Sequence, residues 1–123
     1  MGSHDDNQRL VRTAEELAGR ARLLVQSTET LSVPSDSYAL LAELHATADR
    51  LSTVCGQLGV WHEQVVDGRE YAGEDARGDG ATGTVVAADE LARAAATLAT
   101  AAEALGRAHT ANGVVRWHDD ADG

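Results

Sequence analysis

The chain has 123 residues, which is enough for one domain, and 43% of them are hydrophobic, which excludes a wholly disordered chain. Twenty acidic residues against ten basic ones, all of them arginine, give a formal charge of −10 and disfavour binding to nucleic acid or to an anionic membrane. Because Phe is absent and aromatic residues make up only 3%, any core is expected to consist of Leu, Val and Ala. With no secretion leader and no apolar run of membrane-spanning length, we expect a cytoplasmic protein.

The first helix is predicted from about Asp5 to Leu31. Residues 1–4 are interpreted as the remnant of an expression tag, so His4 is not counted as a possible metal ligand. Leucines and small residues recur in steps of four and three, which is typical of a helix that packs along a narrow seam. Val33-Pro34 ends the pattern, because the residue before a proline avoids the helical region. The seam positions are Leu10, Ala14, Leu17, Ala21, Leu24, Thr28 and Leu31.

The second helix is predicted to begin at a cap formed by Ser35, Asp36 or Ser37 and to extend to about Asp67-Gly68. Its apolar stripe is wide, which indicates more than one packing neighbour. The stripe consists of the seam Leu41, Leu44, Ala48, Leu51, Cys55, Leu58, His62 and Val65, flanked by Leu40, Val54 and Trp61. The single cysteine, Cys55, rules out an intrachain disulfide and is expected to be a small buried hydrophobe. Gly56 and Gly59 interrupt the stripe and mark either a close helix approach or a bend.

Residues 68–83 are rich in Gly, Asp and Glu and are predicted to form a flexible loop. Thr84 is the expected cap of a third helix, which runs to about Ala111, or to Trp117 if Gly113 does not stop it. Leu91, Leu98 and Leu105 recur every seven residues, and rows of alanine beside them favour a close helix approach. Residues 118–123 are expected to form a disordered acidic tail.

These elements predict an all-α fold, in which three long helices form an antiparallel bundle as a single domain over residues 5–117. Narrow seams on three helices leave one apolar side of the second helix open, and dimerisation would complete the bundle.

Alignment of the antiparallel helices places five polar side chains at about the same height, and His45 then faces Gly106. Two interpretations of this layer are open: a surface ion-pair cluster, or a site for a metal or a small molecule. By the same alignment His62 faces Asp89 and is expected to bond its carboxylate. The residues of the layer are Arg22, His45, Asp49, Glu103 and His109. The Glu-x-x-His and His-Glu-x-x-His patterns are absent, so we predict no catalytic residue, metal ligand or cofactor.

Tyr71 and Asp75 have the Tyr-x-x-x-Asp spacing that small helical-hairpin proteins secreted by type VII systems use for export, and they follow a predicted hairpin. The Trp-x-Gly turn of that family is missing, since Val33-Pro34-Ser35 stands in its place. The resemblance implies a secreted helical partner protein.

A broader resemblance covers about Leu10 to His109. The segment Tyr38–Leu44, then Gln57-Leu58 and Trp61, then the Gly-rich loop and the Ala-Leu helix with Ala108-His109 resemble small helical proteins of unassigned function from actinobacteria, some of them carried on mobile elements. The preference for Ala and Arg over Lys and Ile suits such a high-GC genome. The resemblance implies a helical bundle but no activity and no site residues.

The function expected from these patterns is non-enzymatic and depends on association with a second copy of the chain or with a partner helix. The residues expected to supply buried contacts are Leu40, Val54, Trp61, Leu91, Leu98 and Leu105. The alternatives are the secreted partner protein described above and a bundle that binds a small molecule or metal at the polar layer.

Overall fold

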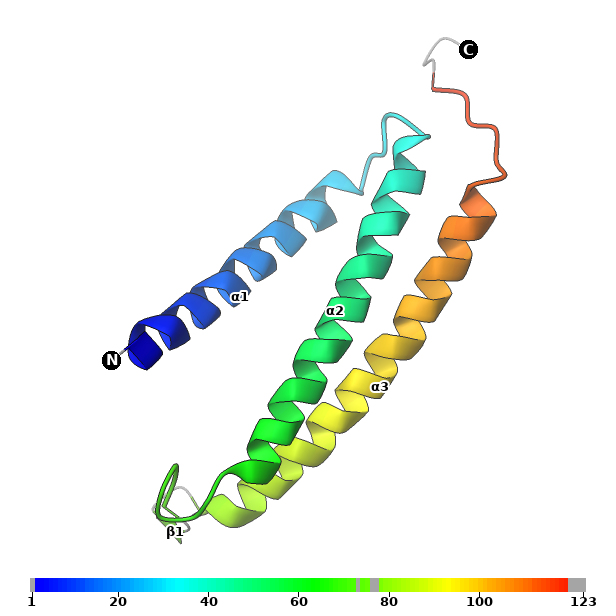
Figure 1. Cartoon of the computed structure of the whole chain (residues 1–123). Coiled ribbons are helices and arrows are strands. Elements are labelled where there is room, and N and C mark those ends of the chain that lie inside the picture. The colour runs from blue at the N-terminus through cyan, green and yellow to red at the C-terminus, as the bar shows by residue number, and fades with distance from the viewer. Residues whose placement is uncertain (1, 73, 76–77, 120–123) are drawn as a thin grey trace. The chain divides into compact units, whose positions relative to one another are not determined.

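The computed structural model describes residues 2–72, 74–75 and 78–119 (Figure 1). It contains three long helices, α1 (Gly2–Ser27), α2 (Asp36–Gln64) and α3 (Gly80–Asn112), which confirms the predicted all-α fold. The chain divides into two compact units: one holds the residues up to Asp36 together with those from Trp117 onward, and the other spans Ser37–Arg116. None of the described helices combines the length and the apolar character that crossing a membrane requires.

Helix α1 ends at Ser27, four residues before the predicted end at Leu31. The hydroxyl groups of Ser27 and Thr28 donate hydrogen bonds of 2.8 Å to the carbonyls of Leu23 and Leu24. Such bonds let serine and threonine compete with further helical hydrogen bonding, and the chain turns after them. Along α1 the leucines of the predicted seam are exposed to solvent.

The segment before α2 is held to the C-terminal segment of its own unit. The Ser35 backbone N–H donates to Asp119 Oδ1 at 2.8 Å, and the Ser35 hydroxyl donates to Oδ2 at 2.7 Å. These bonds favour the charged carboxylate and hold the pKa of Asp119 below its ordinary value. Asp119, which belongs to the expected disordered tail, therefore has a defined partner, and residues 120–123 lie outside the described part of the chain.

Helices α2 and α3 pack against each other as an antiparallel hairpin (Figure 1). The apolar residues that this hairpin buries are small. Their exposed fractions are 8% for Ala48, 5% for Ala88 and 3% for Ala102. Gly59 is buried as well, and a Cβ at this position would lie 3.5 Å from Leu91 Cβ. Gly59 therefore marks a close approach between helices, whereas no atom lies within 4 Å of a Cβ at Gly56.

Three side-chain hydrogen bonds tie the two helices at different heights. Ser52 Oγ donates to the Ala95 carbonyl at 2.7 Å, and His45 Nδ1 lies 2.6 Å from the Ala102 carbonyl oxygen. Near the open end, Asn112 Nδ2 donates to Ser37 Oγ at 2.9 Å. Together these bonds fix the register of the hairpin.

The connection between α2 and α3 is more ordered than the predicted loop. Helix α2 ends at Gln64, before the predicted end at Asp67-Gly68, and Gly68 adopts a φ of 85°, which a glycine tolerates. The short strands β1 (Glu74–Asp75) and β2 (Gly78–Asp79) then pair antiparallel, and β1 packs against α3. The expected flexible loop thus contains a small paired ribbon, while residues 73, 76 and 77 lie outside the described part of the chain.

Helix α3 begins at Gly80, so the prediction that Thr84 caps it is wrong. The cap is Asp79, whose carboxylate accepts hydrogen bonds from the hydroxyl of Thr82 and from the backbone N–H groups of Thr82 and Ala81. These bonds, led by that of the Thr82 hydroxyl, hold the pKa of Asp79 below its ordinary value. The stability that this cap contributes is therefore present above the ordinary aspartate pKa and is lost as the pH falls through the lowered value.

At its other end α3 stops at Asn112, and Gly113 forms the C-terminal cap. The Gly113 N–H donates to the His109 carbonyl at 3.0 Å, and a Cβ at Gly113 would lie 3.0 Å from the Tyr38 ring. The helix therefore does not continue to Trp117, which agrees with the shorter of the two predicted ends.

We expect Gly80→Ala to destabilise the protein, whereas Gly83→Ala in the same helix should not. A Cβ at Gly80 would lie 2.7 Å from the Ala72 carbonyl oxygen and 2.9 Å from the Tyr71 ring, so the backbone must shift at a cost of about 1–3 kcal/mol. At Gly83 no atom lies within 4 Å, and alanine should add up to about 1 kcal/mol through helix propensity. Urea unfolding followed by circular dichroism measures both changes, and equal midpoints would refute the close approach at Gly80.

Candidate interaction surface

The structure gives the members of the predicted polar layer separate surroundings. Asp49 and Glu103 are exposed, while Arg22 lies exposed on α1, in the other unit. His45 bonds the Ala102 carbonyl, and His109 stacks on Tyr38 with ring centroids 4.1 Å apart. Within the described part of the chain, no side-chain hydrogen bond or ion pair joins two members of the layer.

The predicted facing of His45 and Gly106 is confirmed, since a Cβ at Gly106 would lie 3.3 Å from His45 Nδ1. A carbonyl oxygen only accepts, so His45 Nδ1 carries the proton in its bond to Ala102. His45 thus acts as a tie between two helices. Across residues 2–72, 74–75 and 78–119, no group of three or more His, Cys, Asp or Glu side chains is placed to hold a metal ion.

The hairpin carries a second apolar row on each helix, beside the row through which the helices touch. On α2 the contact row includes His45, Ala48, Ser52 and Gly59, and at about 100° per residue the second row lies roughly a quarter turn away. On α3 the second row is displaced from the buried alanines in the same sense, and its first member, Leu91, also takes part in the contact, since its Cβ lies 3.5 Å from a Cβ at Gly59. Because the helices run antiparallel and both displacements have the same rotational sense, the two rows emerge on the same side of the hairpin.

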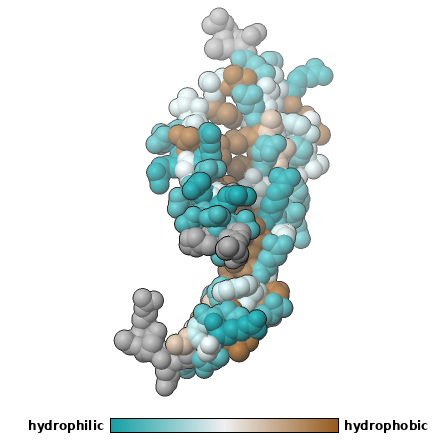
Figure 2. Space-filling model, turned by 60° about the vertical axis from the view of Figure 1, so that its left-hand side comes forward, coloured by the Kyte–Doolittle hydropathy of each residue, from teal (hydrophilic) through white to brown (hydrophobic). Residues whose placement is uncertain are grey.

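We call this surface the leucine face. It consists of Leu40, Leu44, Leu51, Val54, Leu58 and Trp61 on α2 and of Leu91, Leu98 and Leu105 on α3. Trp61 is 53% exposed, and Val54 and Leu58 are each 46% exposed, while the other members are half-buried. Hydrophobic residues are accordingly visible at the molecular surface among hydrophilic ones (Figure 2). The six packing residues expected from the sequence are among these members, and none of them is buried within the single chain.

The seam predicted on α2 is only partly buried in the single chain. Ala48 is buried, whereas Leu44 and Leu51 are half-buried and Leu58 is exposed. Cys55, expected to be buried, is a half-buried free thiol. Likewise, His62 uses Nδ1 to bond the Leu58 carbonyl of its own helix at 2.7 Å.

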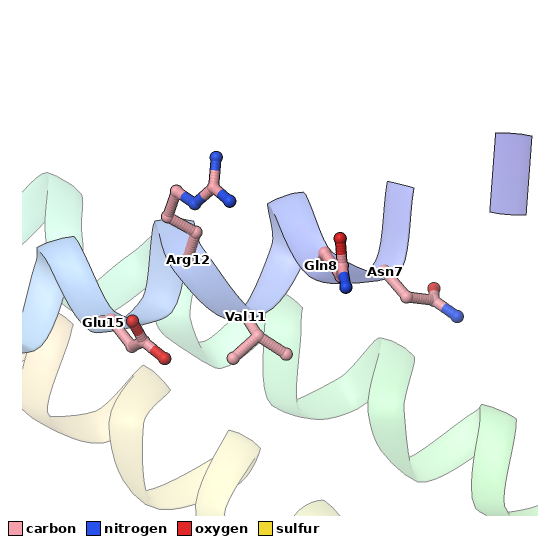
Figure 3. Close-up of a pocket in the computed structure, with 5 residues that line it drawn as sticks. All are labelled: Asn7, Gln8, Val11, Arg12 and Glu15. Atoms are coloured by element: carbon pink, nitrogen blue, oxygen red, sulfur yellow. The ribbon is translucent and has the colours of Figure 1, made fainter. Parts of the chain in front are cut away.

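Two other features of the described chain lie apart from the leucine face. A hollow of about 450 Å³ on α1 is lined by Asn7, Gln8, Val11, Arg12 and Glu15 (Figure 3). These residues are exposed and come from one helix, so they offer a ligand a single wall and we assign no site to them. Tyr71 of the Tyr-x-x-x-Asp pattern is half-buried with its ring against Gly80, and export through that pattern stays a prediction.

No protein-family model, curated protein or solved structure matches the chain. The leucine face is therefore the feature from which a function has to be inferred.

Proposed function

We propose that the protein acts by self-association and that a second copy of the chain covers the leucine face. The observation that supports this proposal is the contrast between the two sides of the hairpin. Its interior buries alanine and glycine, whereas Val54, Leu58 and Trp61 remain about half exposed. Contiguous exposed apolar surface of this kind is typical of interaction sites.

The energetics favour a further packing partner. Full burial of a leucine contributes about 1.5–3 kcal/mol, while burial of an alanine methyl contributes far less. A hairpin with a core of small residues is therefore marginal by itself. Two hairpins that meet through their leucine faces would form a four-helix bundle and remove both rows from water.

Three properties of the face suit a second copy. None of its nine members is charged, and homodimer interfaces are more apolar than other surfaces. The edge of the face on α2 carries Glu43 and Arg50 one heptad apart, so a twofold contact presents both signs of charge to each other. Isologous pairing is also the commonest form of assembly.

We further propose that this role is non-enzymatic and cytoplasmic. The single cysteine, Cys55, is a free thiol, as is usual for proteins of a reducing compartment.

Sedimentation equilibrium of the full chain tests the proposal. We expect a mass of about twice 12.9 kDa that falls toward the monomer value on dilution over about a hundredfold range, together with a melting temperature that rises with concentration. A mass of 12.9 kDa at every concentration, with concentration-independent melting, would overturn self-association.

A further inference from the structure

Helix α1 carries an apolar seam that lies exposed. Leu10 is 68% exposed, Leu17 is 42% exposed, and Ala14 between them is exposed as well. At about 100° per residue, Val11 and Val25 lie along one edge of this seam, and both are exposed. Contiguous rows of exposed apolar side chains are typical of interaction sites. The seam is separate from the leucine face, which lies on α2 and α3.

The charged residues of α1 from Asp5 onward alternate in sign in four blocks, acidic, basic, acidic and basic. The blocks are Asp5 and Asp6, Arg9 and Arg12, Glu15 and Glu16, and Arg20 and Arg22. Each block holds two residues, so these charges cancel, although the whole chain carries a formal charge of −10. Two copies of α1 can therefore meet without the repulsion that the rest of the chain imposes.

The order of the blocks is complementary to its own reverse. An antiparallel pair of α1 helices places every block beside a block of opposite sign, whereas a parallel pair places each block beside an identical one. We propose that α1 pairs antiparallel with α1 of a second copy of the chain, as an additional contact in the dimer that the leucine faces form. This inference rests on the proposed function and adds a second surface to it.

The charges beside the seam select one register for this pair. By the helical repeat, Asp6 and Arg20 flank the seam on the side opposite the valines, and Arg9 and Glu16 lie next to them. In one alignment Asp6 lies beside the partner's Arg20. The same alignment brings Arg9 level with the partner's Glu16. Displacement by one heptad would instead place Glu16 beside the partner's Glu16, so like charges disfavour the neighbouring register.

The selected register also packs the two seams together. Leu10 lies against the partner's Ala14, and the two copies of Val11 meet at the twofold axis. A helix pair with so few apolar contacts is marginal in water by itself. Within the dimer, however, association through the leucine faces raises the effective concentration of the second α1. Leu51→Asp should therefore remove the α1 pair together with the dimer.

Cross-linking between cysteine variants of the full chain tests the pairing. In a Cys55→Ala background, chains with Asp6→Cys and chains with Arg20→Cys are mixed and treated with a short bismaleimide, and the products are identified by mass. We expect the product that joins position 6 to position 20 to exceed each homodimeric product about tenfold, because the register holds these two thiols near each other.

Asp6→Cys mixed with Gly19→Cys is the matched control. Position 19 lies at nearly the same height as position 20 but on the side of α1 opposite the seam, and no atom lies within 4 Å of a Cβ there. The product that joins position 6 to position 19 should stay at the level of random encounter.

Exchange of two charges tests the ion pairs. Asp6→Arg and Arg20→Asp should each weaken the dimer about fivefold, because like charges then meet at both ends of the pair. The double variant should restore the affinity. Positions 6 and 20 lie about 21 Å apart along one helix, so restoration requires two copies of α1. Sedimentation equilibrium measures all three dimer affinities.

Other outcomes would overturn the α1 pair. An excess of the homodimeric products would show parallel helices, and equal yields at positions 19 and 20 would show that a second α1 does not cover the seam. A double variant as weak as the single ones would show that these charges do not meet. Sedimentation of the Cys55→Ala chain separates this failure from that of the proposed function. A dimer without the product between positions 6 and 20 refutes the α1 pair alone, whereas a monomer refutes the dimer itself.

Discussion

Leu51→Asp is expected to abolish self-association while the helices remain formed. Leu51 lies in the α2 row of the leucine face, among Leu44, Val54 and Leu58, and it is half-buried. In a dimer through this face the new carboxylate would be buried without a partner, which costs about 3 kcal/mol and weakens association about a hundredfold. Sedimentation equilibrium reports the loss of the dimer, and far-UV circular dichroism reports the helix content.

Val60→Asp is the matched control for this substitution. It also places a carboxylate on α2 in exchange for an aliphatic side chain, but Val60 is 50% exposed and lies, by the helical repeat, on the side of α2 away from the leucine face. We expect its association to equal that of the unchanged chain. If Leu51→Asp were soluble, fully helical and unchanged in mass, the leucine face would not be the interface.

Ala102→Leu is expected to destabilise the hairpin itself. Ala102 is 3% exposed, and its carbonyl lies 2.6 Å from His45 Nδ1. Three additional carbon atoms at this position must push the helices apart, and that separation also lengthens the His45 bond. Together these effects should cost about 1–3 kcal/mol, measured as a fall in the free energy of unfolding in urea.

Ala104→Leu is the matched control, which shows whether the loss of stability comes from the close helix contact or from the added leucine itself. Ala104 lies two residues along the same helix and is exposed, so the same change in side chain should alter stability by no more than about 0.5 kcal/mol. A similar loss in both variants would mean that the close contact of α2 with α3 does not limit stability.

The sequence predicts the helices well because their signals are local. Apolar residues at steps of three and four predict all three, Pro34 lies in the break before α2, and Gly113 stops α3. The antiparallel register is also predictable, as the facing of His45 and Gly106 shows. Once the position of the connection between two helices is fixed, the constant rise per residue determines which residues lie opposite each other.

What the sequence does not predict depends on contacts between distant residues or on competing local signals. The Asp79 cap was not predicted from the sequence because it lies in a stretch of Gly and Asp that is typical of a loop, although Asp is itself a preferred capping residue. The burial of small residues at the helix contact was not predicted either. Leucine is the stronger signal of a buried seam, but the close approach brings Gly59 to Leu91 Cβ and the Ala88 carbonyl, and the residues that are buried there are alanine and glycine.

The contact between α2 and α3 is lined by small side chains, and this affects how the register of the two helices is determined. Alanine and glycine are too small to interlock strongly across the contact. Shifting one helix by one turn along the other would therefore lose little packing energy. The carbonyls of Ala95 and Ala102 and the hydroxyl of Ser37 are spaced along the hairpin, and each accepts a bond from one particular side chain of the opposite helix. Only one alignment satisfies all three, so polar groups supply the specificity that side-chain shape does not.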